Sequence, residues 1–170
     1  MSMAAFAQDP DVENGKRSFH PEIQAGPEYD FRKTTWGMSI DEVKASEEKK
    51  PDDERFLKDM EEFSYSLSYI DVIFVNYNCQ LMYLFDEGKL TTAELFFLKE
   101  PKSPNAEQLK QALESKFGTP QYDNVSEEQD IHFLGWSFEN SKMVLMEYLS
   151  GRPNAIGSIT FVPVERIKDF

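Results

Sequence analysis

Residues 36–47 read WGMSIDEVKASE and contain the clearest helix start in the chain. Ser39 and Glu42 have the spacing of a capping box, in which the serine oxygen accepts from a backbone N–H in the first turn and the glutamate reaches back to the N–H of the cap. Asp41 adds a second acid to the first turn, where the helix dipole favours negative charge. The stretch therefore predicts a helix that begins after Ser39 and stops before Pro51.

A second capped helix is predicted near Asn105. Asn105 and Gln108 repeat the capping pattern, and Gly118 and Pro120 are typical of a helix end. The apolar residues between them are spaced to share one helix face: Leu109, Ala112, Leu113 and Phe117. This helix is expected to pack one face against a core.

Between and after these helices the hydrophobic pattern changes to that of strands. Residues 51–62 predict one more short helix, but in 63–70, FSYSLSYI, large apolar residues alternate with serine, which indicates a half-buried strand. Two apolar runs, 79–85 and 90–98, flank a turn at Gly88 and predict a hairpin. Further strands are predicted at 131–138, 142–149 and 155–162.

The two halves of the chain follow the same plan. Ser39 and Asn105 are 66 residues apart, and each capped helix is followed by a proline and then by three predicted strands. We expect an α+β fold in which two tandem helix-plus-three-strand repeats, residues 31–100 and 101–170, form one antiparallel sheet with the helices on one face. Residues 1–30, rich in proline, glycine and charge, are expected to form an arm.

Composition excludes several classes of partner. The 170 residues include 31 acids and 18 bases, so the net charge is −13, which repels phosphate backbones and anionic lipids. We therefore expect no nucleic acid partner, and no apolar run of about 18 residues is available to span a membrane. Ala5-Phe6-Ala7 is typical of the end of a secretory signal, which favours a periplasmic or secreted protein over the cytoplasmic alternative.

The motif at the first helix resembles that of a group of small bacterial exported proteins, most of them uncharacterised. Their Trp-Gly-x-Ser-x-x-Glu-Val pattern is matched by Trp36, Gly37, Ser39, Glu42 and Val43. The resemblance extends over roughly residues 31–162 and includes these further segments: Leu67-Ser68-Tyr69, Tyr83-Leu84-Phe85-Asp86, Lys89-Leu90 and KFGTP at 116–120.

The expected helix-plus-sheet repeat is also similar to that of the β-lactamase inhibitor protein and of the small lipoprotein of the outer-membrane barrel-assembly machine. Both are binding proteins, so the resemblance implies a binding module. The chain differs from both, because its single cysteine, Cys79, allows neither the disulfides of the inhibitor nor a lipid anchor directly after a signal.

The sequence offers little chemistry for a metal site, a cofactor or a nucleophile. His20, His132 and Cys79 show no ligand spacing, and a buried inert thiol is the expected state of Cys79 within an apolar strand. A Cys79–His132 pair would require the two half-sheets to bring these residues together. Neither a nucleophile elbow nor a phosphate-binding or calcium-binding loop pattern is present. We expect no cofactor and favour a protein that is not an enzyme.

The strands carry more apolar residues than one covered face requires. In 81–85, LMYLF, and 94–98, ELFFL, almost every position is large and apolar, so a second face is expected either to be covered by the arm or another layer or to be open for a partner. Tyrosine and tryptophan are the side chains that binding faces favour, although the core is the other place where they are commonly buried. The candidate partner-binding residues are Tyr65, Tyr69, Tyr83, Trp136 and Tyr148.

These observations predict an exported, non-enzymatic interaction module that holds a protein or peptide through a sheet face or loops. One alternative is a small hydrolase or ligand-binding protein with a carboxylate-lined cleft between the repeats. A second alternative is an intracellular immunity or accessory factor, for which the acidic charge would suit a basic target.

Overall fold

The structure is a computed structural model that describes residues 12–13, 16–17, 30–58, 62–97, 104–148 and 155–166. Most of the expected arm at 1–30, including Ala5-Phe6-Ala7 and His20, lies outside these residues. Two short strands in the arm, β1 (Val12–Glu13) and β2 (Lys16–Arg17), pair with each other. Among the described residues, no helix is long and apolar enough to cross a membrane.

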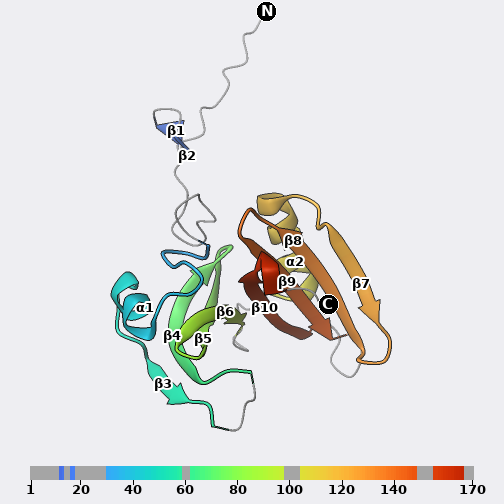
Figure 1. Cartoon of the computed structure of the whole chain (residues 1–170). Coiled ribbons are helices and arrows are strands. Elements are labelled where there is room, and N and C mark those ends of the chain that lie inside the picture. Colours follow the sequence, from blue (N-terminus) through green and yellow to red (C-terminus); the bar gives the residue numbers. More distant parts are fainter. Residues whose placement is uncertain are drawn as a thin grey trace, which may run out of the picture.

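Eight antiparallel strands form one sheet in the order β3-β4-β5-β6-β10-β9-β8-β7 (Figure 1). The strands of the first half are β3 (Asp53–Phe56), β4 (Tyr65–Phe74), β5 (Tyr77–Asp86) and β6 (Lys89–Phe96). Those of the second half are β7 (Tyr122–Ser126), β8 (Ile131–Ser137), β9 (Ser141–Tyr148) and β10 (Ala155–Pro163), followed by the short helix η1 (Val164–Arg166). The halves join where β6 pairs with β10.

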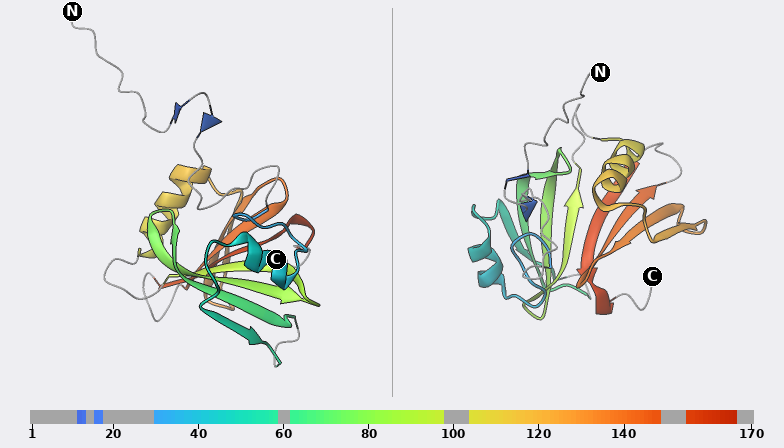
Figure 2. Two further views of the ribbon diagram at one scale, coloured as in Figure 1. Left: turned by 90° about the vertical axis from the view of Figure 1, so that its left-hand side faces the viewer. Right: turned by 90° about the horizontal axis from the view of Figure 1, so that it is seen from above.

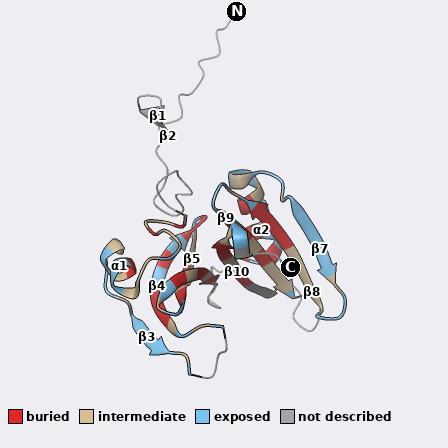
Figure 3. Cartoon of the chain, in the orientation of Figure 1, coloured by how far each residue is buried: buried red, intermediate tan, exposed pale blue. Residues whose placement is uncertain are grey.

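The expected fold class, α+β with two tandem helix-plus-three-strand repeats, is wrong. The chain is mostly sheet, because four strands follow each helix and the helices α1 (Ile40–Ser46) and α2 (Ala106–Phe117) contain only 7 and 12 residues. The sequence pattern missed β3 and β7, and the short helix expected at 51–62 is replaced by β3 at its start. Both missed strands are edges of the sheet and mainly exposed (Figure 3), so neither shows an alternating apolar pattern.

Both predicted helix starts are confirmed. Glu42 Oε2 accepts from the N–H of Ser39 at 2.7 Å, and Ser39 Oγ accepts from the N–H of Glu42 at 3.4 Å. The same reciprocal pair joins Asn105 and Gln108, at 3.0 and 2.8 Å. Each box satisfies two backbone donors that the first turn of a helix leaves without an intrahelical partner.

One face of the sheet forms the core together with both helices. Strand register aligns a row of core residues that are at most 1% exposed: Leu67, Tyr83, Ala93, Phe161, Met143 and Trp136. Val43 of α1 and Leu109 and Leu113 of α2 belong to the same core cluster. In Figure 2, α1 lies beside the green strands of the first half and α2 beside the orange and red strands of the second.

The opposite face of the sheet carries the alternate residues of each strand. Val43 of α1 and Leu109 and Leu113 of α2 are buried in the core cluster, so both helices lie on the core face, and we call the opposite face the helix-free face. Its centre is not apolar throughout, because Ser66, Ser68, Thr92 and Ser158 are buried there. The side chains of the helix-free face do not contribute to the core between the sheet and the helices, so a binding site is sought on this face.

Candidate functional site

A single row of side chains crosses the helix-free face from one edge to the other. Strand register places these residues opposite one another in turn: Tyr122, Gly135, Val144, Thr160, Glu94, Met82, Ser68 and Asp53. Adjacent members of the row lie on neighbouring strands, roughly 5 Å apart. The row starts at an aromatic ring on the edge strand β7 and reaches a carboxylate, Glu94, on the central strand β6.

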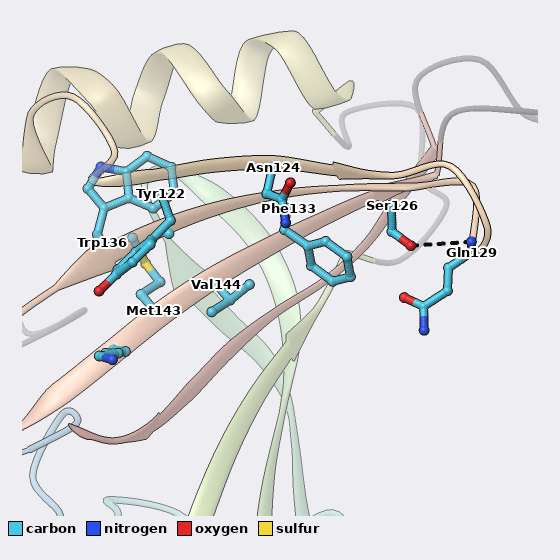
Figure 4. Close-up of a pocket in the computed structure, with 10 residues that line it drawn as sticks. Tyr122, Asn124, Ser126, Gln129, Phe133, Trp136, Met143 and Val144 are labelled. Carbon is cyan, nitrogen blue, oxygen red and sulfur yellow. Dashed lines mark hydrogen bonds between the residues drawn. The ribbon is translucent and has the colours of Figure 1, made fainter. Parts of the chain in front are cut away.

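A pocket of about 550 Å³ lies at the β7 end of this row (Figure 4). Its lining comes from β7, β8, β9 and the β7–β8 turn: Tyr122, Asn124, Ser126, Gln129, Phe133, Gly135, Trp136, Lys142, Met143 and Val144. Phe133 and Val144 supply an apolar wall, while Asn124 supplies an amide and Lys142 a cation. A mainly apolar cavity with a few polar groups, in this range of volume, is typical of a ligand or side-chain binding site.

Gly135 shapes the pocket by letting the Tyr122 ring lie close to strand β8. A Cβ atom at position 135 would stand 3.1 Å from Tyr122 Cδ2 and 3.2 Å from Tyr122 Cβ, closer than such carbons normally approach. Lys142 Nζ lies 5.6 Å from the centroid of the same ring, within cation–π range. Tyr122 is therefore held in place from two sides although 54% of its surface is exposed.

The pocket lining is mainly apolar and carries no carboxylate, imidazole or thiol. None of its ten residues is an aspartate, glutamate, histidine or cysteine, so the carboxylate-lined cleft of the alternative hypothesis is not found at this pocket. The lining can offer a ligand apolar contacts, hydrogen bonds from amide side chains and one positive charge, that of Lys142. Within the described residues there is also no group of three or more side chains that could hold a metal ion.

His132 and Cys79 lie on the core side of the sheet and apart from each other. His132 Nε2 is 2.7 Å from Asp123 Oδ1, and its Nδ1 is 3.4 Å from Glu147 Oε2. The pKa of Asp123 is lowered, mainly by its hydrogen bond to His132. Cys79 is buried in β5, separated from His132 in β8 by three intervening strands, and its thiol donates to Val72 O. The sheet does not bring them together as a nucleophile and base.

The structure separates the five aromatic residues singled out in the sequence. Tyr69, Tyr83 and Trp136 lie in the core, at most 1% exposed. The Trp136 indole N–H is used there, donating to Gly118 O at 2.8 Å. Tyr65 is half-buried and donates to Glu54 at 2.6 Å. Tyr148 alternates onto the helix-free face and is 45% exposed, but it does not line the pocket.

Sequence reasoning missed the residues that do line the pocket. Tyr122 lies in an edge strand without a periodic pattern, so nothing marked it as a surface anchor. Gly135 was the usable signal, because a lone glycine within a strand indicates that another group approaches the backbone closely. In this sheet the approaching group is the Tyr122 ring.

Comparison with known proteins adds a structural similarity only. No protein-family model matches the sequence, and no curated protein matches it. Among solved structures, the chain is similar to a DUF4309 family protein, YjgB, from Bacillus subtilis subsp. subtilis str. 168. The sequence identity is 9%, the TM-score is 0.47, and the match covers 74% of this chain and 78% of the other.

Proposed function

We propose that this protein is a non-enzymatic binding module that holds a protein or peptide partner on the helix-free face, at the pocket between β7 and β9. The observation that supports this most directly is the composition of the pocket lining, which combines an exposed tyrosine and an apolar wall with few polar groups and contains no carboxylate, imidazole or thiol. Exposed aromatic residues beside a cavity are typical anchors of protein and peptide interfaces.

The charge and the sequence resemblance support two further parts of the proposal. A net charge of −13 favours partners that carry basic groups, since complementary charge speeds encounter and disfavours acidic competitors. The first-helix motif and Ala5-Phe6-Ala7 support action outside the cytoplasm, which cell fractionation of the native organism would test. Recovery of the protein only in the cytosolic fraction would contradict that part.

A peptide-display selection against the immobilised full chain tests the proposal. We expect selected peptides to lose at least about tenfold in affinity, or roughly 1.4 kcal/mol, on Tyr122→Ala. Tyr148→Ala is the matched control, because Tyr148 is an exposed tyrosine of the same face outside the pocket lining. Failure to enrich any peptide, or equal effects of the two substitutions, would contradict binding at this pocket.

A further inference from the structure

Glu94 is the carboxylate at the centre of the row that crosses the helix-free face, whereas the other carboxylate of the row, Asp53, lies on the exposed edge strand β3. Its cross-strand neighbours in the row, Thr160 on β10 and Met82 on β5, are uncharged. Thr160 Oγ1 donates to Glu94 Oε1 at a long 3.5 Å, and the residue is half-buried. Among the described residues, this half-buried carboxylate therefore has one hydrogen-bond donor, and that hydrogen bond is long.

Nothing in the described part of the chain neutralises this carboxylate. No lysine or arginine there pairs with Glu94, and burial raises the pKa of the Glu94 carboxyl, to which the nearby charge of Glu62 adds. A half-buried carboxylate without a cation opposes the stability of the folded chain, because water solvates the ion better than the protein does. A group that destabilises the fold and lies in the same row of side chains as a pocket is a candidate for a role in binding.

We propose that Glu94 is the charge anchor of the helix-free face and receives a lysine or arginine side chain from an extended peptide segment whose neighbouring large apolar side chain fills the β7–β9 pocket. This inference rests on the proposed function and specifies the chemistry of the partner. Lys142, in the pocket lining, already supplies positive charge toward the β7 edge, so a cationic group of the ligand is favoured at the Glu94 end of the row.

The row also defines the spacing of the two anchor side chains. Val144 and Gly135, which line the pocket, lie two and three strands from Glu94, or roughly 10 and 14 Å at the usual strand spacing. Side chains four residues apart in an extended chain point to the same side and lie roughly 13 Å apart. The expected ligand therefore carries a large apolar residue and a basic residue at positions i and i+4, in either order.

Two defined probes test this chemistry. They are the acetylated, amidated peptide Ser-Phe-Ser-Ser-Ser-Lys-Ser and its reversed-order counterpart, each with a control in which glutamine replaces lysine. Titration of ¹⁵N-labelled full-length protein, followed by amide chemical shifts, measures affinity and location together. We expect at least one lysine peptide to shift the amides of Glu94, Thr160 and the pocket residues, and to bind at least about tenfold more weakly to Glu94→Gln.

The controls separate a lost charge from a lost fold. Glu107→Gln makes the same charge change on the exposed surface of α2 and should leave the affinity unchanged. Glu94→Gln should melt at no lower a temperature than the wild type at neutral pH, because it removes a half-buried charge without reducing side-chain volume. Lysine peptides that bind Glu94→Gln and the wild type equally, or that leave the Glu94 amide unperturbed, would overturn the inference.

The same titration distinguishes failure of the anchor from failure of the binding site. If lysine and glutamine peptides bind equally well and Tyr122→Ala abolishes both, the anchor role of Glu94 is overturned while the proposed pocket function stands. If none of the peptides binds to the helix-free face, the anchor role is again overturned. The display selection then decides the proposed function independently, because it does not presuppose a basic ligand.

Discussion

The indole N–H of Trp36 donates a hydrogen bond to Ser141 Oγ at 3.1 Å, joining residues that are 105 positions apart. Ser141 Oγ in turn donates to the carbonyl of Asp30 at 2.7 Å, and the Asp30 carboxylate accepts from the backbone N–H of Trp36 at 2.6 Å. This closed set of three hydrogen bonds ties the segment before α1 to strand β9 in the other half of the chain. The stretch WGMSIDEV therefore includes a structural link between the halves.

Replacing Trp36 should destabilise the fold through lost packing and a lost hydrogen bond. Trp36 is partly buried against the core cluster, so we expect Trp36→Ala to lower the free energy of unfolding by about 3 kcal/mol. Trp36→Phe keeps most of the packing and should cost about 1 kcal/mol. Urea denaturation measures both. A Trp36→Phe variant as stable as the wild type would contradict a contribution from the Ser141 hydrogen bond, and equal losses for the two variants would contradict a contribution from packing.

Removing the first helix cap should have a small, definite effect. Ser39→Ala deletes the oxygen that accepts from the Glu42 N–H and should lower the free energy of unfolding by about 1 kcal/mol. Ser137→Ala, at an exposed strand position, serves as the comparison and should change stability by less than about 0.5 kcal/mol. If thermal melts showed the two variants to be alike, the capping contribution of Ser39 would be refuted.

The Tyr83 hydroxyl holds α1 to the sheet through Glu47. Tyr83 is fully buried and donates to Glu47, whose other carboxylate oxygen accepts from Arg32 Nη2 at 3.2 Å. Burial is the main cause that raises the pKa of Tyr83 well above its usual range, so the hydroxyl keeps its proton. Tyr83→Phe removes one donor from a half-buried carboxylate and should cost about 1–3 kcal/mol in chemical denaturation. If Tyr83→Phe had the same denaturation midpoint as the wild type, the hydrogen bond from Tyr83 to Glu47 would make no net contribution to stability.

Glu94 should make stability depend on pH in a direction opposite to that of an ion-paired carboxylate. Burial raises its pKa above the ordinary value of 4.5, so the folded state binds a proton more tightly than the unfolded state. The stabilising contribution is present at acid pH and is lost as pH rises through the raised pKa. We expect Glu94→Gln to increase the melting temperature at pH 7 and to lose that advantage near pH 4. A gain of equal size at both pH values would contradict the assignment.

Adding one methyl group at Gly135 should alter the pocket more than the fold. The new Cβ would meet the Tyr122 ring at 3.1 Å, and this exposed ring can move away. We expect Gly135→Ala to weaken selected peptides by about tenfold, or roughly 1.4 kcal/mol, with a smaller change in stability. Peptide titration and a thermal melt of the same sample compare the two effects. Unchanged affinity would show that the position of Tyr122 does not control binding.

The parts of the fold that were predictable from sequence depend on residues close together in the chain. Ser39 with Glu42, and Asn105 with Gln108, are each three residues apart, so their capping boxes are visible without knowledge of the fold. The edge strands β3 and β7 were missed because each has one neighbour and mainly exposed side chains, which leaves no pattern of period two. Their absence from the prediction led to three strands per half where the sheet has four.

The candidate site was less predictable than the fold because it depends on contacts between residues that are far apart in the chain. Periodicity indicates that a strand has two faces, but it does not say which face the helices cover. By sequence, Tyr83 and Trp136 were equally suited to a core or to a binding surface. The structure places both on the core face of the sheet, where they are buried. Tyr122 became a candidate only when register placed its ring against Gly135.

By itself, the sequence determined where both helices begin, where the central hairpin turns and that the surface is acidic, because these features follow from local hydrogen bonding, backbone preference and composition. Only the tertiary structure decided which side chains meet. Glu94 and Thr160 are 66 residues apart and become neighbours because β6 and β10 pair at the centre of the sheet. Strand pairing is a long-range choice, and a one-residue change of register would move every side chain of a strand to the other face.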